Sequence, residues 1–231
     1  MNPEATMPLP MLMPMPMPMP MPMPMPSAPG QPQRRVLWPT VVLLALSLLT
    51  ACSSTPLPPL QLYRMAVAAP LPVPAAAAGA DASVWQLLGP VRLPGYLDRD
   101  AVLVPQGEAG LQALPGQRWA EPLHEAVPRL LREDLALLRG RQRLWAAPVP
   151  AGVVVQRQLR VELLALEANA DRSQVQLRAQ WSLADPNGKQ PPHVGSAQLS
   201  AAVAGSTVDA LVAAHRLVLW QLAMAISQTP L

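Results

Sequence analysis

Residues 174–183 alternate apolar and polar side chains without interruption. Because successive side chains of a strand point to opposite faces of a sheet, this pattern predicts a strand with one buried and one solvated face. Similar alternation over 158–166 and 194–202 flanks it, and the polar segments 169–173 and 185–188 supply turns. We therefore expect a three-stranded antiparallel meander, which limits the fold to classes that cover one face of a sheet.

Two amphipathic helices are predicted to supply that cover. Residues 121–138 place apolar side chains at three- and four-residue spacing. Pro122 is acceptable in the first turn, whereas Pro128 is expected to kink the helix or to delay its start. A final helix is expected to begin with Ser206 as N-cap and with Asp209 in the capping-box position three residues later.

Shorter apolar runs add further strands to this pattern. They lie near residues 60–65, 84–90, 101–104 and 111–114. The sequence therefore predicts an α/β fold, a single layered domain with a mixed, partly antiparallel sheet and two main helices. The alanine- and proline-rich segment 66–82 is expected to be a flexible loop, because its prolines and its lack of periodicity disfavour a helix.

The N-terminal region has the features of a secretory signal. Residues 13–26 are seven Met-Pro pairs, and proline at every second position excludes helix and central strand. Arg34 and Arg35 then precede the apolar stretch 36–49, which is too short to cross a bilayer that takes about 20 helical residues. Charged, apolar and small residues in this order indicate a signal peptide. The true translation start is left open, because any of several methionines up to Met25 could serve.

The only cysteine of the chain ends this region. Cys52 directly follows Leu49, Thr50 and Ala51. The run resembles the lipobox of bacterial lipoprotein signals, in which small residues give the peptidase access to the backbone. That resemblance implies cleavage before Cys52 and acylation of its sulfur and new N-terminus by fatty acids such as palmitate. A buried structural cysteine is the alternative.

This reading divides the chain into three parts. Residues 1–51 are the signal peptide with an extended Met-Pro-rich start, 52–59 the lipidated tether, and 60–231 the folded domain. Ser53 is not aspartate, and by resemblance to Gram-negative sorting signals it favours the outer membrane. Cleavage would leave 180 of the 231 residues, enough for one ordinary domain. No later segment is expected to span a membrane.

The charge balance argues against a nucleic-acid partner. The net charge of the whole chain is +3. It becomes +2 when Arg34, Arg35 and Glu4 are removed with the signal peptide. No basic cluster with interleaved aromatic residues accompanies this small excess.

Residue types that could take part in catalysis or metal binding are scattered along the sequence. The three histidines, His124, His193 and His215, lie far apart, and His215 falls on the apolar stripe of the last helix, where a satisfied core residue is expected. There is no second cysteine for zinc and no sequence motif of a metalloprotease, serine hydrolase or phosphate loop. We therefore expect no metal, no cofactor and no enzymatic activity.

We interpret the two closest pairs of carboxylates as structural rather than catalytic. Glu133 and Asp134 are adjacent on a predicted helix and so point in different directions, which indicates a solvated face. Asp98 and Asp100 flank Arg99 in a predicted loop, where turn formation or salt bridging explains them better than acid-base catalysis.

Two longer blocks carry a family resemblance. Residues 88–99, with their Leu-Pro-Gly-Tyr-Leu-Asp-Arg run, and residues 118–123 resemble the paraquat-inducible protein C (PqiC) type of lipoprotein, the auxiliary lipoprotein component of ABC-type transport systems. The resemblance covers about 49–231. It implies a periplasmic α/β domain on the inner face of the outer membrane. The implied partners are a substrate-binding protein of the mammalian-cell-entry type and an ABC permease and ATPase, in lipid traffic that maintains the outer membrane.

The resemblance leaves the partner contacts, the oligomeric state and the alternative functions undecided. Residues 114–117 depart from the family pattern, which puts regular edge pairing in doubt there. Tyr96 and Trp119 are candidate partner contacts, with core packing as the alternative for Trp119. A homo-oligomer is compatible with the chain. The alternative functions are an envelope scaffold or assembly lipoprotein and, less favoured, a lipoprotein hydrolase.

Overall fold

The computed structural model describes residues 58–66, 68–71, 73 and 82–230. The signal peptide, the cleavage motif, Cys52 and most of the loop expected over 66–82 lie outside the described residues. The strands are β1 (Gln61–Tyr63), β2 (Trp85–Leu87), β3 (Ala101–Gln106), β4 (Gly110–Trp119), β5 (Leu144–Ala146), β6 (Arg157–Ala168), β7 (Gln174–Ala184) and β8 (His193–Ala202). The helices are α2 (Leu123–Arg139) and α3 (Val208–Ser227), with short 3₁₀ helices at Gly95–Leu97 and Arg141–Arg143.

The larger sheet contains the predicted meander. Its strand order is β5-β2-β6-β7-β8, in which β6, β7 and β8 are antiparallel and β2 is parallel to both of its neighbours. Past β2, the chain stays beside β6 through a single bridge between Arg92 and Glu162. The sheet is therefore mixed and partly antiparallel, as predicted. Strand β5 was not predicted.

A second, three-stranded sheet was also not predicted. Strand β4 pairs in parallel with β1 and antiparallel with β3. Two steps along β3, from Ala101 to Leu103, correspond to five steps along β4, from Arg118 to Ala113. The surplus lies in residues 114–117, so the segment that departs from the family pattern is a bulge inside a strand that continues past it on both sides.

Gly116 makes this bulge possible. Its φ of 71° lies in the left-handed region that favours glycine. A Cβ at this position would lie 2.7 Å from the carbonyl oxygen of Pro59, which precedes β1. The glycine therefore permits both the turn of the backbone and the close approach of the β1 segment.

Both predicted helices exist, with different starts. Pro122 is the N-cap of α2 rather than a residue of its first turn, and the helix continues through Pro128 without interruption. Helix α3 begins after Thr207, whose hydroxyl oxygen accepts a hydrogen bond from the Ala210 N–H at 3.2 Å. The assignment of Ser206 as N-cap was therefore wrong by one residue, and Asp209 lies in the second helical position rather than the third.

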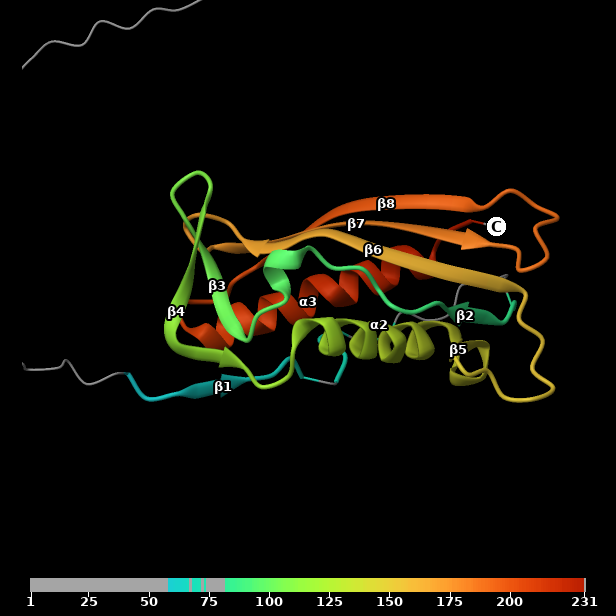
Figure 1. The fold of residues 1–231 in the computed structure, drawn as a ribbon, viewed down its shortest axis with the longest axis horizontal. Coiled ribbons are helices and arrows are strands. Elements are labelled where there is room, and N and C mark those ends of the chain that lie inside the picture. The colour runs from blue at the N-terminus through green and yellow to red at the C-terminus, as the bar shows by residue number, and fades with distance from the viewer. Residues whose placement is uncertain (1–57, 67, 72, 74–81, 231) are drawn as a thin grey trace, which may run out of the picture. The chain divides into compact units, whose positions relative to one another are not determined.

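The two helices pack against each other and cover one face of the larger sheet (Figure 1). By length and composition alone α3 is a possible membrane span, contrary to the expectation that no later segment would qualify. Most of its apolar stretch is buried in the core. The largest fully buried side chains come from both helices and the larger sheet and include Trp85, Leu130, Leu163, Leu177 and Leu219.

Candidate functional site

The two blocks that resemble the lipoprotein family meet where the two sheets join. Trp119, at the end of β4, is 7% exposed, and its ring meets the ring of His215 edge to face, with centroids 5.5 Å apart. Tyr96, in the first 3₁₀ helix, accepts a hydrogen bond from the Leu166 N–H at 3.2 Å. The blocks therefore tie the smaller sheet, α3 and β6 together.

Burial controls the ionisation of this junction. Burial lowers the pKa of His215, and the contact of its Nδ1 with the Leu211 carbonyl oxygen at 2.8 Å opposes the shift. Burial also raises the pKa of the Tyr96 hydroxyl, against the effect of its hydrogen bond from Leu166. Both groups are therefore neutral near pH 7, which suits a packed junction.

The cavity at this junction is small. Its volume of about 20 Å³ is room for roughly one water molecule. Tyr96, Trp119 and His215 are among the residues that line it. The expectation that Tyr96 and Trp119 contact a partner stays a prediction; the position of Trp119 agrees with the core-packing alternative.

The histidines are not brought together. His124 lies with its Nδ1 3.0 Å from a carboxylate oxygen of Asp98, and Asp100 pairs with Arg118 at 2.6 Å. The salt-bridging interpretation is therefore confirmed for Asp100, whereas the carboxylate of Asp98 contacts a histidine, which forms an ion pair only when it is protonated. Within the described part of the chain, no cluster of three or more histidine, cysteine, aspartate or glutamate side chains could hold a metal ion.

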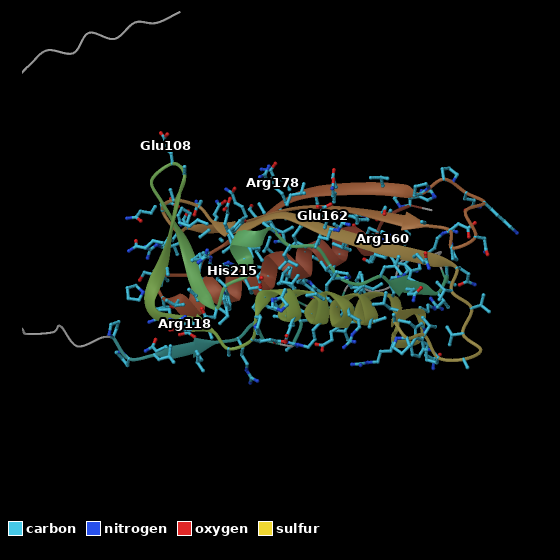
Figure 2. All side chains as sticks on the ribbon, in the orientation of Figure 1. Glu108, Arg118, Arg160, Glu162, Arg178 and His215 are labelled. Atoms are coloured by element: carbon cyan, nitrogen blue, oxygen red, sulfur yellow. The ribbon has the colours of Figure 1, made fainter. Side chains whose placement is uncertain are left out.

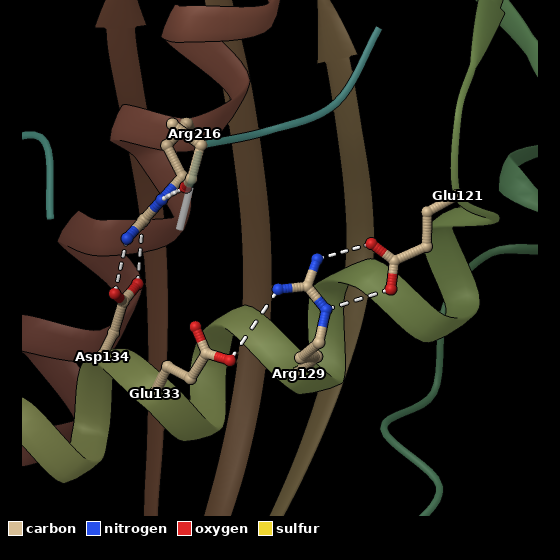
Figure 3. A network of polar contacts seen from close by, with 6 residues as sticks. Glu121, Arg129, Glu133, Asp134 and Arg216 are labelled. Carbon is tan, nitrogen blue, oxygen red and sulfur yellow. Dashed lines mark hydrogen bonds and ion pairs between the residues drawn. The ribbon is translucent and has the colours of Figure 1, made fainter. Parts of the chain in front are cut away.

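The interpretation of Glu133 and Asp134 as a solvated pair was wrong for Asp134 (Figure 3). Asp134 is 0% exposed and receives two hydrogen bonds from Arg216 of α3, at 2.6 and 2.8 Å. The Nε–H of Arg216 also donates to the carbonyl oxygen of Ala66 at 2.7 Å. Glu133 instead lies 3.8 Å from Arg129. Adjacent helical positions do point apart, but one of them points into the core.

A groove on the outer face of the larger sheet was not predicted. It has a volume of about 430 Å³ and runs between the segment after β2 and strands β6, β7 and β8. The outer face carries Arg160, Glu162 and Arg178 (Figure 2), and the Gln180 side chain donates a hydrogen bond to Glu162 at 2.9 Å. The apolar part of its lining includes Leu88, Pro90, Val161, Trp181 and Val194. Alternation identified which side chains face outward, but the groove also depends on where the segment after β2 lies.

These observations define the class of protein: a mixed α/β domain in which two helices cover one face of a five-stranded sheet. The contacts around Trp119, Tyr96 and His215 join a smaller, three-stranded sheet to that body. Residues 63–227 match the family described as ABC-type transport auxiliary lipoprotein component. The chain belongs to that family, as its resemblance to paraquat-inducible protein C-type lipoproteins predicted.

Solved structures share the fold at low sequence identity. One, described only as an uncharacterized protein, is 17% identical with a TM-score of 0.57, over 74% of this chain and 98% of its own. Protein XCC0632 from Xanthomonas campestris, of the family DUF330, is 15% identical with a TM-score of 0.54, over 72% of this chain and 92% of its own. No curated protein matches the chain by sequence.

Proposed function

We propose that this protein is an outer-membrane lipoprotein that serves as a non-catalytic accessory subunit of an ABC-type lipid transport system. The observation that carries the proposal is the family match over residues 63–227, and the sequence before it supports the proposal with an apolar segment followed by Cys52. The family description names an auxiliary component, which supports a role without catalysis.

Lipid attachment would fix the domain to the membrane surface. Each acyl methylene that enters the bilayer contributes about 0.8 kcal/mol, so several acyl chains on one N-terminus hold a protein far more firmly than one. Strand β1 begins at Gln61, nine residues after Cys52. Nine residues span at most about 30 Å. The tether therefore keeps the smaller sheet close to the periplasmic face of the outer membrane.

The proposed partners are a substrate-binding protein of the mammalian-cell-entry type and its inner-membrane permease and ATPase. An anchored domain of this kind would dock the end of a lipid conduit that reaches the outer membrane. This part of the proposal rests on the family resemblance of residues 88–99 and 118–123.

The anchor is tested by labelling cells with radioactive palmitate and fractionating their membranes. The parent chain is expected to take up label and to sediment with the outer membrane, whereas Cys52→Ala loses both properties. Ser53→Ala is the matched control, because it changes the next residue and leaves the sulfur in place. Equal labelling and fractionation of Cys52→Ala and the parent would refute lipid attachment at this residue.

The transport role is tested separately by crosslinking the parent protein in cells and identifying what it captures. Recovery of a mammalian-cell-entry-type protein with a permease and ATPase is the expected result. Recovery of envelope assembly or cell-wall machinery without any transport subunit would reject the transport role and favour the scaffold alternative, even if the palmitate experiment succeeds.

A further inference from the structure

Two exposed leucines lie beside each other at the start of the folded domain. Leu60 directly precedes β1 and Leu62 lies within it, and they are 61% and 62% exposed, more than any other leucine of the described residues. The chain before them already lies against β4, where the carbonyl oxygen of Pro59 comes close to Gly116. Because side chains two residues apart on an extended chain point to the same side, about 7 Å from each other, the leucines form one apolar pair.

The other face of β1 is the one that packs on the domain. Tyr63 is paired in register with the buried Trp119 and packs against the core. Leu62 is paired in register with Arg118 of β4, which is exposed. The leucine pair therefore lies on the outward face of a strand whose inward face is fixed to the core.

The position of this pair in the chain indicates what can cover it. Leu60 follows Cys52 by eight residues, which span at most about 29 Å. In the anchored form proposed above, on which this inference rests, the leucines therefore stay close to the bilayer surface. The tether also makes docking an event within one molecule, so that even a weak contact is well populated.

The charges next to the pair suit a lipid surface. Arg64 is exposed and lies two residues after Leu62, on the same side of the chain. Arginine binds phosphate oxygens through its planar fork of N–H donors. The carboxylate of Asp100 is paired with Arg118 at 2.6 Å, so its negative charge is offset. Apolar side chains next to a basic one are typical of protein surfaces that lie in the headgroup region of a membrane.

We propose that the face of β1 that carries Leu60 and Leu62 docks on the phospholipid bilayer that holds the acyl chains of Cys52. The two leucines enter the boundary between headgroups and acyl chains, and Arg64 lies among the lipid phosphates. Docking adds a second contact to the flexible tether. It fixes one orientation of the smaller sheet on the membrane, which the tether alone does not.

The first test measures whether lipid reaches Leu62. Leu62→Cys is made in the full chain, which is purified after processing, labelled with a thiol-reactive NBD dye and inserted through its anchor into vesicles of phosphatidylethanolamine and phosphatidylglycerol. Acylation protects the sulfur of Cys52, so only the new cysteine takes the dye. Nitroxide-bearing phospholipids are expected to quench this dye about threefold more than the same dye on Val154→Cys. Val154 is the matched control, because it is 72% exposed and its loop, between β5 and β6, lies at the opposite end of the domain from β1 (Figure 1).

The outcomes of this test separate docking from anchoring. Strong quenching in Leu62→Cys with weak quenching in Val154→Cys supports docking. Equal quenching in the two variants overturns it while the anchor stands. A dye on Leu62→Cys that emits as in an apolar site but is not quenched by the lipids also overturns it, because a second copy or another protein then covers the leucines. Dye bound to Cys52 of the parent chain shows a free sulfur, which rejects the anchor and the inference with it.

The second test uses the charge of Arg64. In the labelled Leu62→Cys chain, Arg64→Glu is expected to reduce quenching about threefold in the same vesicles, because the anionic surface repels a carboxylate. Arg132→Glu is the matched control, since Arg132 is an exposed arginine on α2. Thermal unfolding of each variant should stay close to that of the parent. Equal quenching with Arg64→Glu and Arg132→Glu would refute the placement of Arg64 among the lipid phosphates.

Discussion

The buried ion pair between α2 and α3 should be the most sensitive point of the fold. Asp134 is 0% and Arg216 2% exposed, and two hydrogen bonds join them. Burial raises the pKa of Asp134, and the hydrogen bonds from Arg216 oppose that shift. In this pair the attraction between the two charges therefore offsets the free-energy cost of burying each of them. Removing one partner leaves the other charge buried without that offset.

The size of the effect follows from that compensation. Asp134→Ala leaves a guanidinium in the core without its carboxylate, at a cost of about 3–5 kcal/mol. That is a large share of the roughly 5–15 kcal/mol that stabilises a typical domain. In Asp134→Leu with Arg216→Met both charges are gone, and the carbonyl of Ala66, an exposed residue, can bind water instead. We expect this double variant to lie within about 1 kcal/mol of the parent, because apolar replacement of a buried pair is often neutral.

The assay is urea unfolding followed by tryptophan fluorescence, with each single substitution and the double substitution compared in a thermodynamic cycle. Glu133→Ala is the matched control, because Glu133 is the adjacent carboxylate on the same helix, lies 3.8 Å from Arg129 and is about 31% exposed rather than fully buried. It should cost less than about 1 kcal/mol. If Asp134→Ala costs no more than Glu133→Ala, or if the double variant loses the sum of both single effects, the reasoning fails.

Three further outcomes can be measured by the same unfolding assay. Gly195→Ala should lose about 1–3 kcal/mol, because the new Cβ would overlap the ring of Trp181; an unchanged midpoint would contradict this. Burial lowers the folded-state pKa of His215 from 6.5, so the unfolded chain binds more protons as the pH falls. Parent stability should therefore decrease below about pH 6.5, by at most about 1.4 kcal/mol per pH unit, and His215→Leu should remove that part of the slope; identical slopes would show that His215 is not responsible. Thr207→Ala should cost about 1 kcal/mol and Ser206→Ala nearly nothing, whereas the reverse order would restore Ser206 as the cap.

The sequence predicted those parts of the fold whose pattern is local and long. Strands β6, β7 and β8 each contain ten to twelve residues, which is enough for alternation to identify the buried face. The two helices were equally clear from their spacing. Strands β1, β2 and β5 have three residues each, and their parallel partners lie far along the chain. Alternation over three residues cannot distinguish a strand from a loop, so β5 and the second sheet depended on tertiary pairing that no local pattern records.

The same limit explains the error at Asp134. The two residues before it, Arg132 and Glu133, are charged, so its immediate sequence resembles a solvated helix face. The signal lies 82 residues away, in Arg216, a charged residue on the mostly apolar buried face of α3. A charged residue inside a buried helical face requires a partner of opposite sign. Searching the other predicted helix for an acidic residue on its apolar side would have found Asp134, which lies four residues after Leu130 on α2. Two polar residues that each break an apolar stripe are therefore worth considering together, because each explains the burial of the other.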